Sequence, residues 1–199
     1  MLYLMPDGSS MTILPPYFGV MTTPYPRTPY RGYTKEGRVW GLDNGAYTKG
    51  TFEVKVFFDF LEDMESLWST LLWAVIPDKV GCAETTLALY ETWLPIFREY
   101  PIKAAFVAQD GIRAGDLPQD FDCLFIGGTN VFKQSPESEA CMREGKRRGK
   151  WVHVGRVNTW GRLLWAWANG ADSVDGTCIA YGRSVNLKRL LRWMKRING

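Results

Sequence analysis

Short apolar segments alternate with amphipathic segments along most of this chain. The apolar segments are rich in aliphatic and aromatic residues, and most end at a carboxylate, an amide or a glycine; they cover 38–43, 71–78, 103–109, 123–128, 151–157 and 173–177. The segments between them place apolar residues three and four positions apart, the spacing of a helix that buries one face; they cover 52–68, 83–97, 136–149, 160–168 and 186–194. This pattern predicts strands that alternate with helices.

Sequence signals mark several boundaries of these elements. Ser135 followed by Pro136 is a typical helix start, Gly170 is a typical helix end, and Asn186 is expected to cap the last helix. The first 38 residues are rich in Pro, Tyr and Gly, which predicts one early strand followed by a long ordered loop. A loop of this kind over a barrel often contributes to function.

Strict alternation of strands and helices favours parallel strands with helices packed outside them. About seven or eight strands are predicted, which suits a compact TIM-like (β/α) barrel of the α/β class. The alternative is an open, doubly wound sheet. The chain has 199 residues and no long linker, so residues 1–199 are expected to form a single barrel domain without a zinc subdomain.

Composition fits a globular protein but says little about its partners. Apolar residues make up 46% of the chain, which is enough for a hydrophobic core, and the net charge of +3 does not by itself indicate nucleic-acid binding. The basic residues are concentrated at 146–150 and near the C-terminus. We predict phosphate contacts for the first cluster and for Arg183, Lys188 and Arg192, with solvated helix faces as the alternative.

Few side chains suit a metal centre. The four cysteines, Cys82, Cys123, Cys141 and Cys178, form no CxxC pair, and His153 is the single histidine. We therefore expect neither a metal nor a cofactor. The sequence contains no signal peptide and no long apolar run, so we expect no membrane association and a cytoplasmic location with free thiols.

Polar residues and glycines gather at the predicted carboxyl ends of the strands, which meet on one rim of a parallel barrel. They are Asp43, Asp78, Gln109, Gly127, Gly128, Gly155 and Asp175. Two carboxylates at one site can break a glycosidic bond, because one attacks the sugar while the other carries the proton. Carboxylate and amide groups can also bind the polar edge of an extruded purine. The alternative for each aspartate is an ordinary turn or helix cap.

The loops beyond the strand ends suit two kinds of ligand. Tyr47 lies four residues after Asp43 and offers a ring for stacking on a base, or for filling the core or a turn. Gly-rich sequences at 127–130 and 170–177 suit a phosphate instead, which would favour a small phosphorylated metabolite bound at 127–130 and 176–177.

These segments resemble, in the same order, the catalytic core of the tRNA-guanine transglycosylase superfamily. The segments that carry the resemblance are Leu42-Asp43-Asn44-Gly45-Ala46-Tyr47, Ile76-Pro77-Asp78, Val107-Ala108-Gln109-Asp110-Gly111, Ile126-Gly127-Gly128, Val154-Gly155 and Gly170-Ala171-Asp172-Ser173-Val174-Asp175. The resemblance spans about residue 40 to residue 178, which is most of the chain. It implies a TIM barrel that exchanges a base on a nucleic acid.

The resemblance also implies a role for each matching residue. Asp175 would be the nucleophile, and Asp43 would be the general acid/base. Tyr47 would stack on the base, and the side chains of Asp78 and Gln109 would bind its polar edge. Backbone contacts would come from Gly127 and Gly128, and the floor of the pocket would be formed by Val154 and Gly155. Val154 and Tyr47 would enclose the base from opposite faces.

Departures from the family pattern suggest a substrate other than tRNA. Members that act on tRNA carry a zinc-binding Cys/His segment after the nucleophile, whereas the residues after Asp175 include only one cysteine and no histidine. Asp-Gly-Thr also replaces Asp-Cys-Val at 175–177. A zinc-free chain is more similar to the DNA 7-deazaguanine transglycosylases of phages and bacterial modification clusters.

That similarity implies DNA and a free 7-deazaguanine base, such as 7-cyano-7-deazaguanine, as partners, in the host cytoplasm if a phage encodes the chain. Three alternatives stay open: the same exchange on tRNA, a non-catalytic binding protein with this fold, and a phosphate-binding barrel enzyme acting on a small metabolite.

Overall fold

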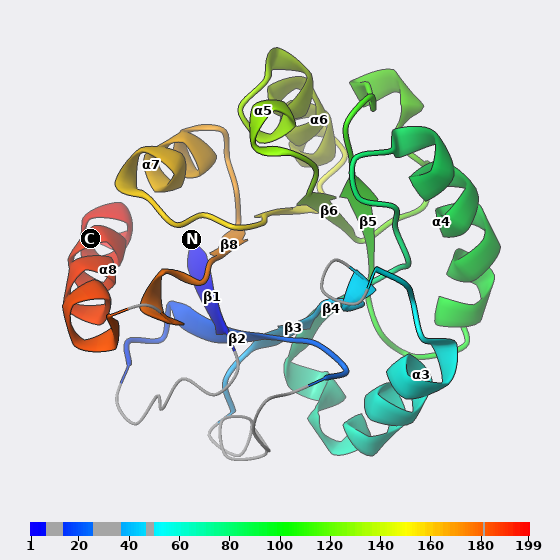
Figure 1. The fold of residues 1–199 in the computed structure, drawn as a ribbon, viewed down its shortest axis with the longest axis horizontal. Helices are drawn as coiled ribbons and strands as arrows, with labels where there is room; N and C mark the ends of the chain where they lie inside the picture. Colours follow the sequence, from blue (N-terminus) through cyan, green and yellow to red (C-terminus); the bar gives the residue numbers. More distant parts are fainter. Residues whose placement is uncertain (7–13, 26–36, 47–49, 181) are drawn as a thin grey trace.

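The computed structural model describes residues 1–6, 14–25, 37–46, 50–180 and 182–199. Parallel strands form a closed barrel, and helices surround it on the outside (Figure 1). Each strand pairs with the next along the chain, and the last pairs with the first through Leu2↔Ser173, Tyr3↔Val174 and Leu4↔Asp175. The predicted TIM-like barrel is confirmed, and the alternative of an open sheet is wrong.

The strands are short and almost entirely apolar, as expected for parallel strands that are covered on both sides. They are β1 (Leu2–Pro6), β2 (Phe18–Thr22), β3 (Trp40–Leu42), β4 (Leu71–Val75), β5 (Ala104–Ala108), β6 (Cys123–Ile126), β7 (Trp151–Val154) and β8 (Ser173–Asp175).

Most of the described helices lie between successive strands, and the last one follows β8. They are α3 (Val54–Asp63), α4 (Ala83–Phe97), α5 (Asn130–Lys133), α6 (Pro136–Arg147), α7 (Trp160–Ala168) and α8 (Arg183–Asn198), with 3₁₀ turns η1 (Glu65–Thr70), η2 (Ala114–Asp116) and η3 (Cys178–Ala180). Thr129, Ser135 and Thr159 each accept a hydrogen bond from a backbone N–H in the first turn of the helix that follows. None of the helices in the described part of the chain has the length and apolar content needed to span a lipid bilayer.

The first 38 residues contain two strands rather than the single strand that we predicted. β2 lies between proline-rich segments, and its second position is Gly19, so its sequence gives a weak strand signal. The glycine is needed for packing, since a Cβ at this position would lie 2.6 Å from the backbone oxygen of Val39.

Two helix predictions also need correction. The helix predicted over 52–68 ends at Asp63 and continues as η1. The last helix begins at Arg183 after Gly182, whose φ of 65° is in the left-handed region that glycine tolerates. Asn186 therefore lies inside the first turns of α8 rather than at its N-cap, and its side chain donates a hydrogen bond of 2.7 Å to the carbonyl of Cys178.

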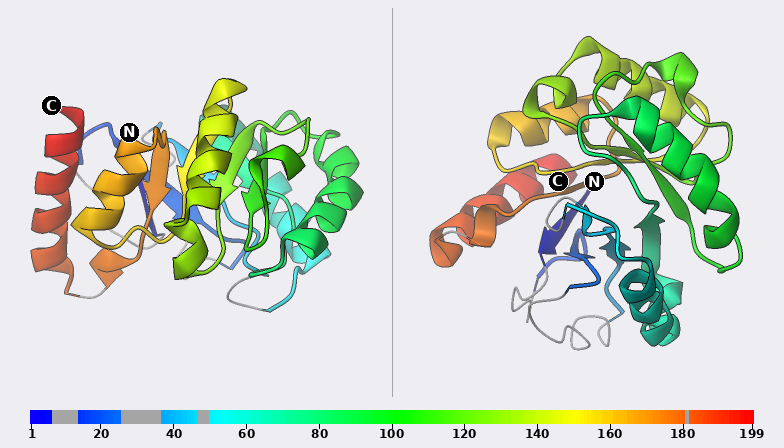
Figure 2. Two further views of the ribbon diagram at one scale, coloured as in Figure 1. Left: turned by 90° about the horizontal axis from the view of Figure 1, so that it is seen from above. Right: turned by 45° about the vertical axis from the view of Figure 1, so that its right-hand side comes forward.

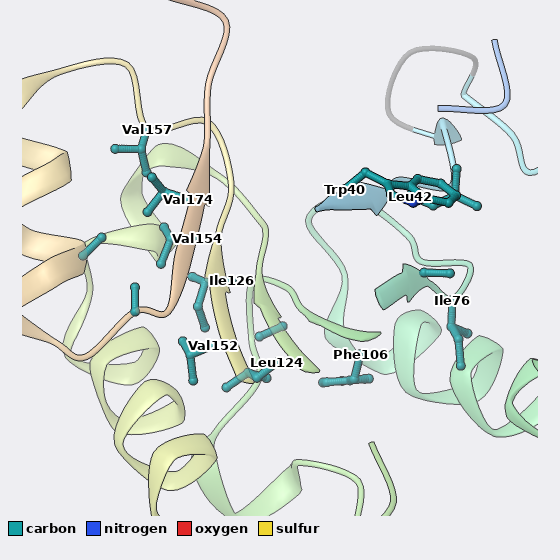
Figure 3. Close-up of a cluster of buried hydrophobic side chains, with 14 of the residues drawn as sticks. Trp40, Leu42, Ile76, Phe106, Leu124, Ile126, Val152, Val154, Val157 and Val174 are labelled. Carbon is teal, nitrogen blue, oxygen red and sulfur yellow. The ribbon is translucent and has the colours of Figure 1, made fainter. Parts of the chain in front are cut away.

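The two faces of each strand build two separate clusters. Outward-facing residues such as Trp40, Phe106 and Ile126 pack against the helices and form the main core (Figure 3). Inward-facing residues form a smaller cluster that fills the barrel; it includes Leu4, Trp73, Val75, Ala105, Val107, Cys123 and Phe125. Because side chains alternate along a strand, membership in these clusters decides which residues face the barrel interior.

Candidate active site

The carboxyl ends of the strands meet at one end of the barrel, which we call the mouth. Five residues lie at inward-facing positions at the ends of their strands or just beyond them: Asp43, Gln109, Gly127, Gly155 and Asp175. The residue before each of them belongs to the main core outside the barrel, and side chains alternate along a strand. The prediction that the carboxyl ends of these strands meet on one rim of a parallel barrel is therefore confirmed.

Asp175, at the end of β8, is held by two donors. Its Oδ1 accepts a hydrogen bond of 3.0 Å from the backbone N–H of Arg156 and lies 3.1 Å from Nε2 of His153. The side chain is 16% exposed, so one part of the carboxylate stays accessible. A carboxylate that accepts such bonds is fixed in orientation.

His153 lies in the barrel interior beneath Asp175 and is fully buried between the rings of Trp73 and Phe125, at centroid distances of 4.8 and 4.5 Å. Burial lowers the pKa of His153, so the imidazole is neutral at pH 7. Its Nδ1 lies 2.8 Å from Oγ of Ser173, which itself accepts a hydrogen bond from the indole of Trp151. The Ser173 hydroxyl can thus donate to Nδ1, which leaves the proton on Nε2 and directs it to Asp175.

Asp43 follows β3 and has a different environment. Its pKa is raised to about 7, mainly by burial and also by the negative charges of Asp78 and Asp175, whereas the hydrogen bond from Gly45 N–H (2.7 Å) and the charge of Arg156 oppose this rise. Asp43 is thus close enough to Asp78 and Asp175 for electrostatic interaction. A carboxyl group with a pKa near neutrality can both give and take a proton at physiological pH.

Asp78, Gln109 and Asn44 form one hydrogen-bonded group beside Asp43. Asp78 accepts a bond of 2.7 Å from the amide of Asn44 and one of 2.5 Å from the amide of Gln109. Gln109 in turn accepts a bond of 2.9 Å from Gly81 N–H, which fixes the orientation of its amide. Burial raises the pKa of Asp78, and the two side-chain amides oppose that shift.

Replacing Gln109 with leucine should destabilise the free protein by about 1–3 kcal/mol, because the half-buried carboxylate of Asp78 and the N–H of Gly81 would each lose a partner. Denaturant unfolding of both proteins measures this difference. The matched control is Gln119→Leu at an exposed position, which should stay within about 0.5 kcal/mol of wild type. Equal stability of the Gln109 variant and wild type would contradict the role of this amide.

The glycines at the mouth permit close packing. A Cβ on Gly155 would lie 2.7 Å from the Phe125 ring and 3.3 Å from Asp175 Oδ1, and a Cβ on Gly127 would lie 3.0 Å from the amide of Gln109. Gly128 has a φ of 75°, and its carbonyl accepts a hydrogen bond of 2.8 Å from the Arg156 guanidinium. The Gly128 carbonyl therefore already has one partner inside the protein.

Among the predicted site residues, Val154 faces away from the barrel interior, and two others are not covered by the described part of the structure. Val154 belongs to the outer core beside the helices (Figure 3), because its neighbour His153 takes the inward position on β7, so the prediction that Val154 encloses a base is wrong. Tyr47 lies outside the described residues, as does the side chain of Arg183.

Lys188 and Arg192 are exposed on α8, on the outside of the barrel. The left view of Figure 2 shows that α8 begins at the end of the barrel to which β8 points and runs away from it. With a rise of about 1.5 Å per residue, Arg192 lies roughly 14 Å along the helix from Arg183. Lys188 is thus the nearer of the two to the mouth, and a phosphate contact stays a prediction for both.

The basic cluster at 146–150 lies at the other end of the barrel, between α6 and the start of β7. Lys146 pairs with Asp172 at 2.8 Å, and Arg147 and Arg148 both bond to Glu144 at 2.6 Å. These cations have partners within the protein and are far from the mouth, so the predicted phosphate contact of this cluster is not supported.

Four residues at the mouth were not predicted as site residues: Asn44, Lys133, His153 and Arg156. His153 entered the sequence prediction only as the single histidine, which argued against a zinc site, although its position two residues before Gly155 implies the same inward face. Arg156 directly follows β7 and has a φ of 59°, which is unusual for a residue other than glycine. Among the described residues, no three or more His, Cys, Asp or Glu side chains are grouped in a way that could hold a metal ion.

Comparison with known proteins identifies the fold only. No family model matches the sequence, and no curated protein matches it. Among solved structures, a flavocytochrome b2 mutant with pyruvate bound is similar at a TM-score of 0.62 and 12% identity, covering 98% of this chain and 63% of that chain. A tryptophan synthase from M. tuberculosis is similar at a TM-score of 0.54 and 14% identity, covering 98% and 90%.

A mandelate oxidase mutant is also similar, at a TM-score of 0.56 and 13% identity, covering 90% of this chain and 62% of that chain. The chain thus spans less than two thirds of the flavocytochrome and oxidase chains that it matches. The shared feature is the barrel, and it defines the class: a (β/α)₈-barrel protein with a polar, acidic site at the carboxyl ends of its strands.

Proposed function

We propose that this protein is a base-exchange transglycosylase that replaces guanine in DNA with a 7-deazaguanine, such as 7-cyano-7-deazaguanine, through a covalent aspartyl–sugar intermediate. The observation that carries the proposal is the contrast between two carboxyl groups at one mouth. Asp175 is held in place through one oxygen by His153 and the N–H of Arg156 and stays partly accessible, whereas burial raises the pKa of Asp43 to about 7. Two carboxyl groups with opposed environments suit the roles of nucleophile and general acid/base.

In the first half-reaction, guanine is extruded from the helix, and the carboxylate of Asp175 attacks C1′ of its sugar. The C1′–N9 bond breaks, its electron pair goes to N9, and the protonated carboxyl group of Asp43 gives its proton to the departing base. The products are a sugar–aspartyl ester, free guanine and an ionised Asp43. His153 and the N–H of Arg156 keep the nucleophile oriented throughout.

In the second half-reaction, a free 7-deazaguanine occupies the place of guanine. Asp43 removes the proton from N9, and N9 attacks C1′ from the original face. The ester bond breaks and returns the electron pair to Asp175. Two inversions retain the configuration at C1′, and both carboxyl groups regain their starting protonation states.

The group formed by Asn44, Asp78 and Gln109 suits the polar edge of a purine. Guanine presents N–H donors at N1 and N2, and each oxygen of a carboxylate has room for a second hydrogen bond. The internal bonds of 2.5–2.7 Å hold Asp78 in place before a base arrives. Preorganisation of this kind lowers the entropy cost of binding.

The direct test is an exchange assay with labelled 7-cyano-7-deazaguanine and either guanine-containing DNA or tRNA. The proposal predicts label in DNA and release of an equal amount of guanine, with no label in a control DNA that lacks guanine. Label in tRNA alone would favour the alternative RNA substrate. Label in neither polymer would overturn base exchange.

A second candidate is a barrel enzyme that acts on a small metabolite. The similar structures favour it, since they include a tryptophan synthase and a flavocytochrome b2 with pyruvate bound. The predicted phosphate loops offer it limited support. At 127–130, the N–H and hydroxyl of Thr129 already bond to the carboxylate of Asp110, and at 176–177 the N–H of Thr177 bonds to Asn158 at 2.7 Å. A small phosphorylated ligand would need other donors.

A further inference from the structure

Lys133, the last residue of α5, is a buried cation that the proposed reaction does not use. Its side chain is only 4% exposed, and its ammonium group makes no hydrogen bond or ion pair within the described part of the chain. Its pKa is lowered to about 8, mainly by burial and also by the charge of Arg156. The ammonium tip itself is not sealed from solvent, so a ligand can reach it. Burying the rest of a cationic side chain without an ion-pair partner is unfavourable, and an anionic ligand would offset that cost.

The position of Lys133 connects it to the proposed nucleophile. Its charge interacts with those of Asp175 and Arg156, and also with His153 on the barrel side of the nucleophile. Lys133 and Asp175 nevertheless form no ion pair; the partners of the carboxylate are Arg156 N–H and His153, both at Oδ1. The two charged groups therefore lie in the same part of the mouth without contact.

Charge is divided across the mouth. The acidic residues Asp43 and Asp78 follow β3 and β4. Three cations, Lys133, Arg156 and Arg162, belong to α5, the segment after β7 and the first turn of α7, where they outnumber the two nearby carboxylates, Asp110 and Asp175. Figure 1 shows β3 and β4 on the other side of the barrel from α5 and α7. One side suits the N–H groups of a base, and the other suits an anion.

We infer that Lys133, beside Arg156, binds a phosphate group of the substrate. Under the proposed function, on which this inference rests, that group is a phosphodiester next to the sugar that Asp175 attacks. Phosphates are the only anionic groups of DNA, and they are joined to the same sugar as the reacting C1′. The guanidinium of Arg156 is held at this edge by its bond to the carbonyl of Gly128.

The test measures binding rather than turnover. The probe is an oligodeoxynucleotide with one guanine, prepared with ordinary phosphodiesters or with neutral methylphosphonates on both sides of that nucleoside. Lys133→Met should weaken binding of the phosphodiester probe about tenfold to a hundredfold, as expected for one charge-assisted hydrogen bond, and should not further weaken binding of the neutral probe. Lys133→Arg should retain most of the affinity.

The matched control is Lys103→Met, which removes an exposed cation just before β5, at the far end of the barrel, and should change affinity less than twofold. Methionine is similar in length to lysine, and the Lys133→Met change removes a buried charge, so this variant is expected to fold as well as wild type. Equal losses for the two probes, or no loss for either, would overturn the inference even if exchange activity is present.

Binding of inorganic phosphate and of 2′-deoxyguanosine 5′-phosphate distinguishes a site for a DNA phosphodiester from a site for the phosphate of a small molecule. Lys133-dependent binding of either one, without binding of the oligonucleotide, would support the phosphate site and overturn the proposed action on DNA.

Discussion

Replacing Asp175 with asparagine should lower the rate of base exchange by roughly a thousandfold or more. The amide oxygen of asparagine can still accept the bonds from Arg156 N–H and His153 Nε2, so the local structure should persist. The amide is a poor nucleophile, so no ester with C1′ forms. Single-turnover release of labelled guanine from DNA measures the loss. Wild type incubated with DNA alone should form a covalent adduct, detectable by mass, that the variant lacks.

The matched control is Asp172→Asn, three residues earlier in the same segment. Asp172 lies at the other end of β8, where it pairs with Lys146 and accepts a bond from Val152 N–H. Exchange by this variant should stay within about twofold of wild type, since it is remote from the mouth. If the Asp175 variant kept a tenth of wild-type activity, another group would have to be the nucleophile.

The ends of the strands could be predicted because short apolar segments and segments with helical spacing alternate regularly along the chain. Apolar runs ending in Asp43, Asp78, Gln109 and Asp175 alternate with amphipathic helices, and parallel strands bring such ends to one rim whatever the details of packing. The prediction needed only the chain order of the elements. It did not need to know which residues touch.

The residues that were missed depend on contacts between different elements. His153 contacts Asp175 through the register of β7 and β8, and Lys133 reaches the same region from α5. No spacing along the sequence encodes either contact. Val154 was assigned to the wrong face because it was placed in the pocket together with its neighbour Gly155, although adjacent residues of a strand point to opposite faces.

The pH dependence of the two half-reactions should have opposite signs. Asp43 must be protonated to release guanine and ionised to accept the proton of the incoming base, and its pKa is raised to about 7. Guanine release should therefore fall about tenfold per pH unit above pH 7, while the attack of 7-cyano-7-deazaguanine on the trapped intermediate should fall below pH 7. Rapid-quench measurements of each step, with a pH jump between them, resolve the two profiles.

Asp43→Asn should slow both steps by roughly a hundredfold to ten-thousandfold and remove both inflections, because asparagine neither gives nor takes the proton. A guanine-release profile that stays flat between about pH 6 and pH 9 in wild type would exclude Asp43 as the proton donor.

Protein stability checks the same pKa without substrate. The folded pKa of Asp43, about 7, lies above its ordinary value of 3.8, so the folded protein keeps a proton that the unfolded chain has lost between these values. Wild type should lose stability as the pH rises from about 4 to 7, relative to Asp43→Asn. The difference between a pKa of 3.8 and one of about 7 corresponds to at most ~4 kcal/mol, at 1.36 kcal/mol per pH unit. Because the Asp43 side chain is partly exposed, we expect about half of that. A stability difference between the two proteins that does not change over this pH range would mean that Asp43 titrates as an ordinary carboxylate, and the proton-transfer role would fail with it.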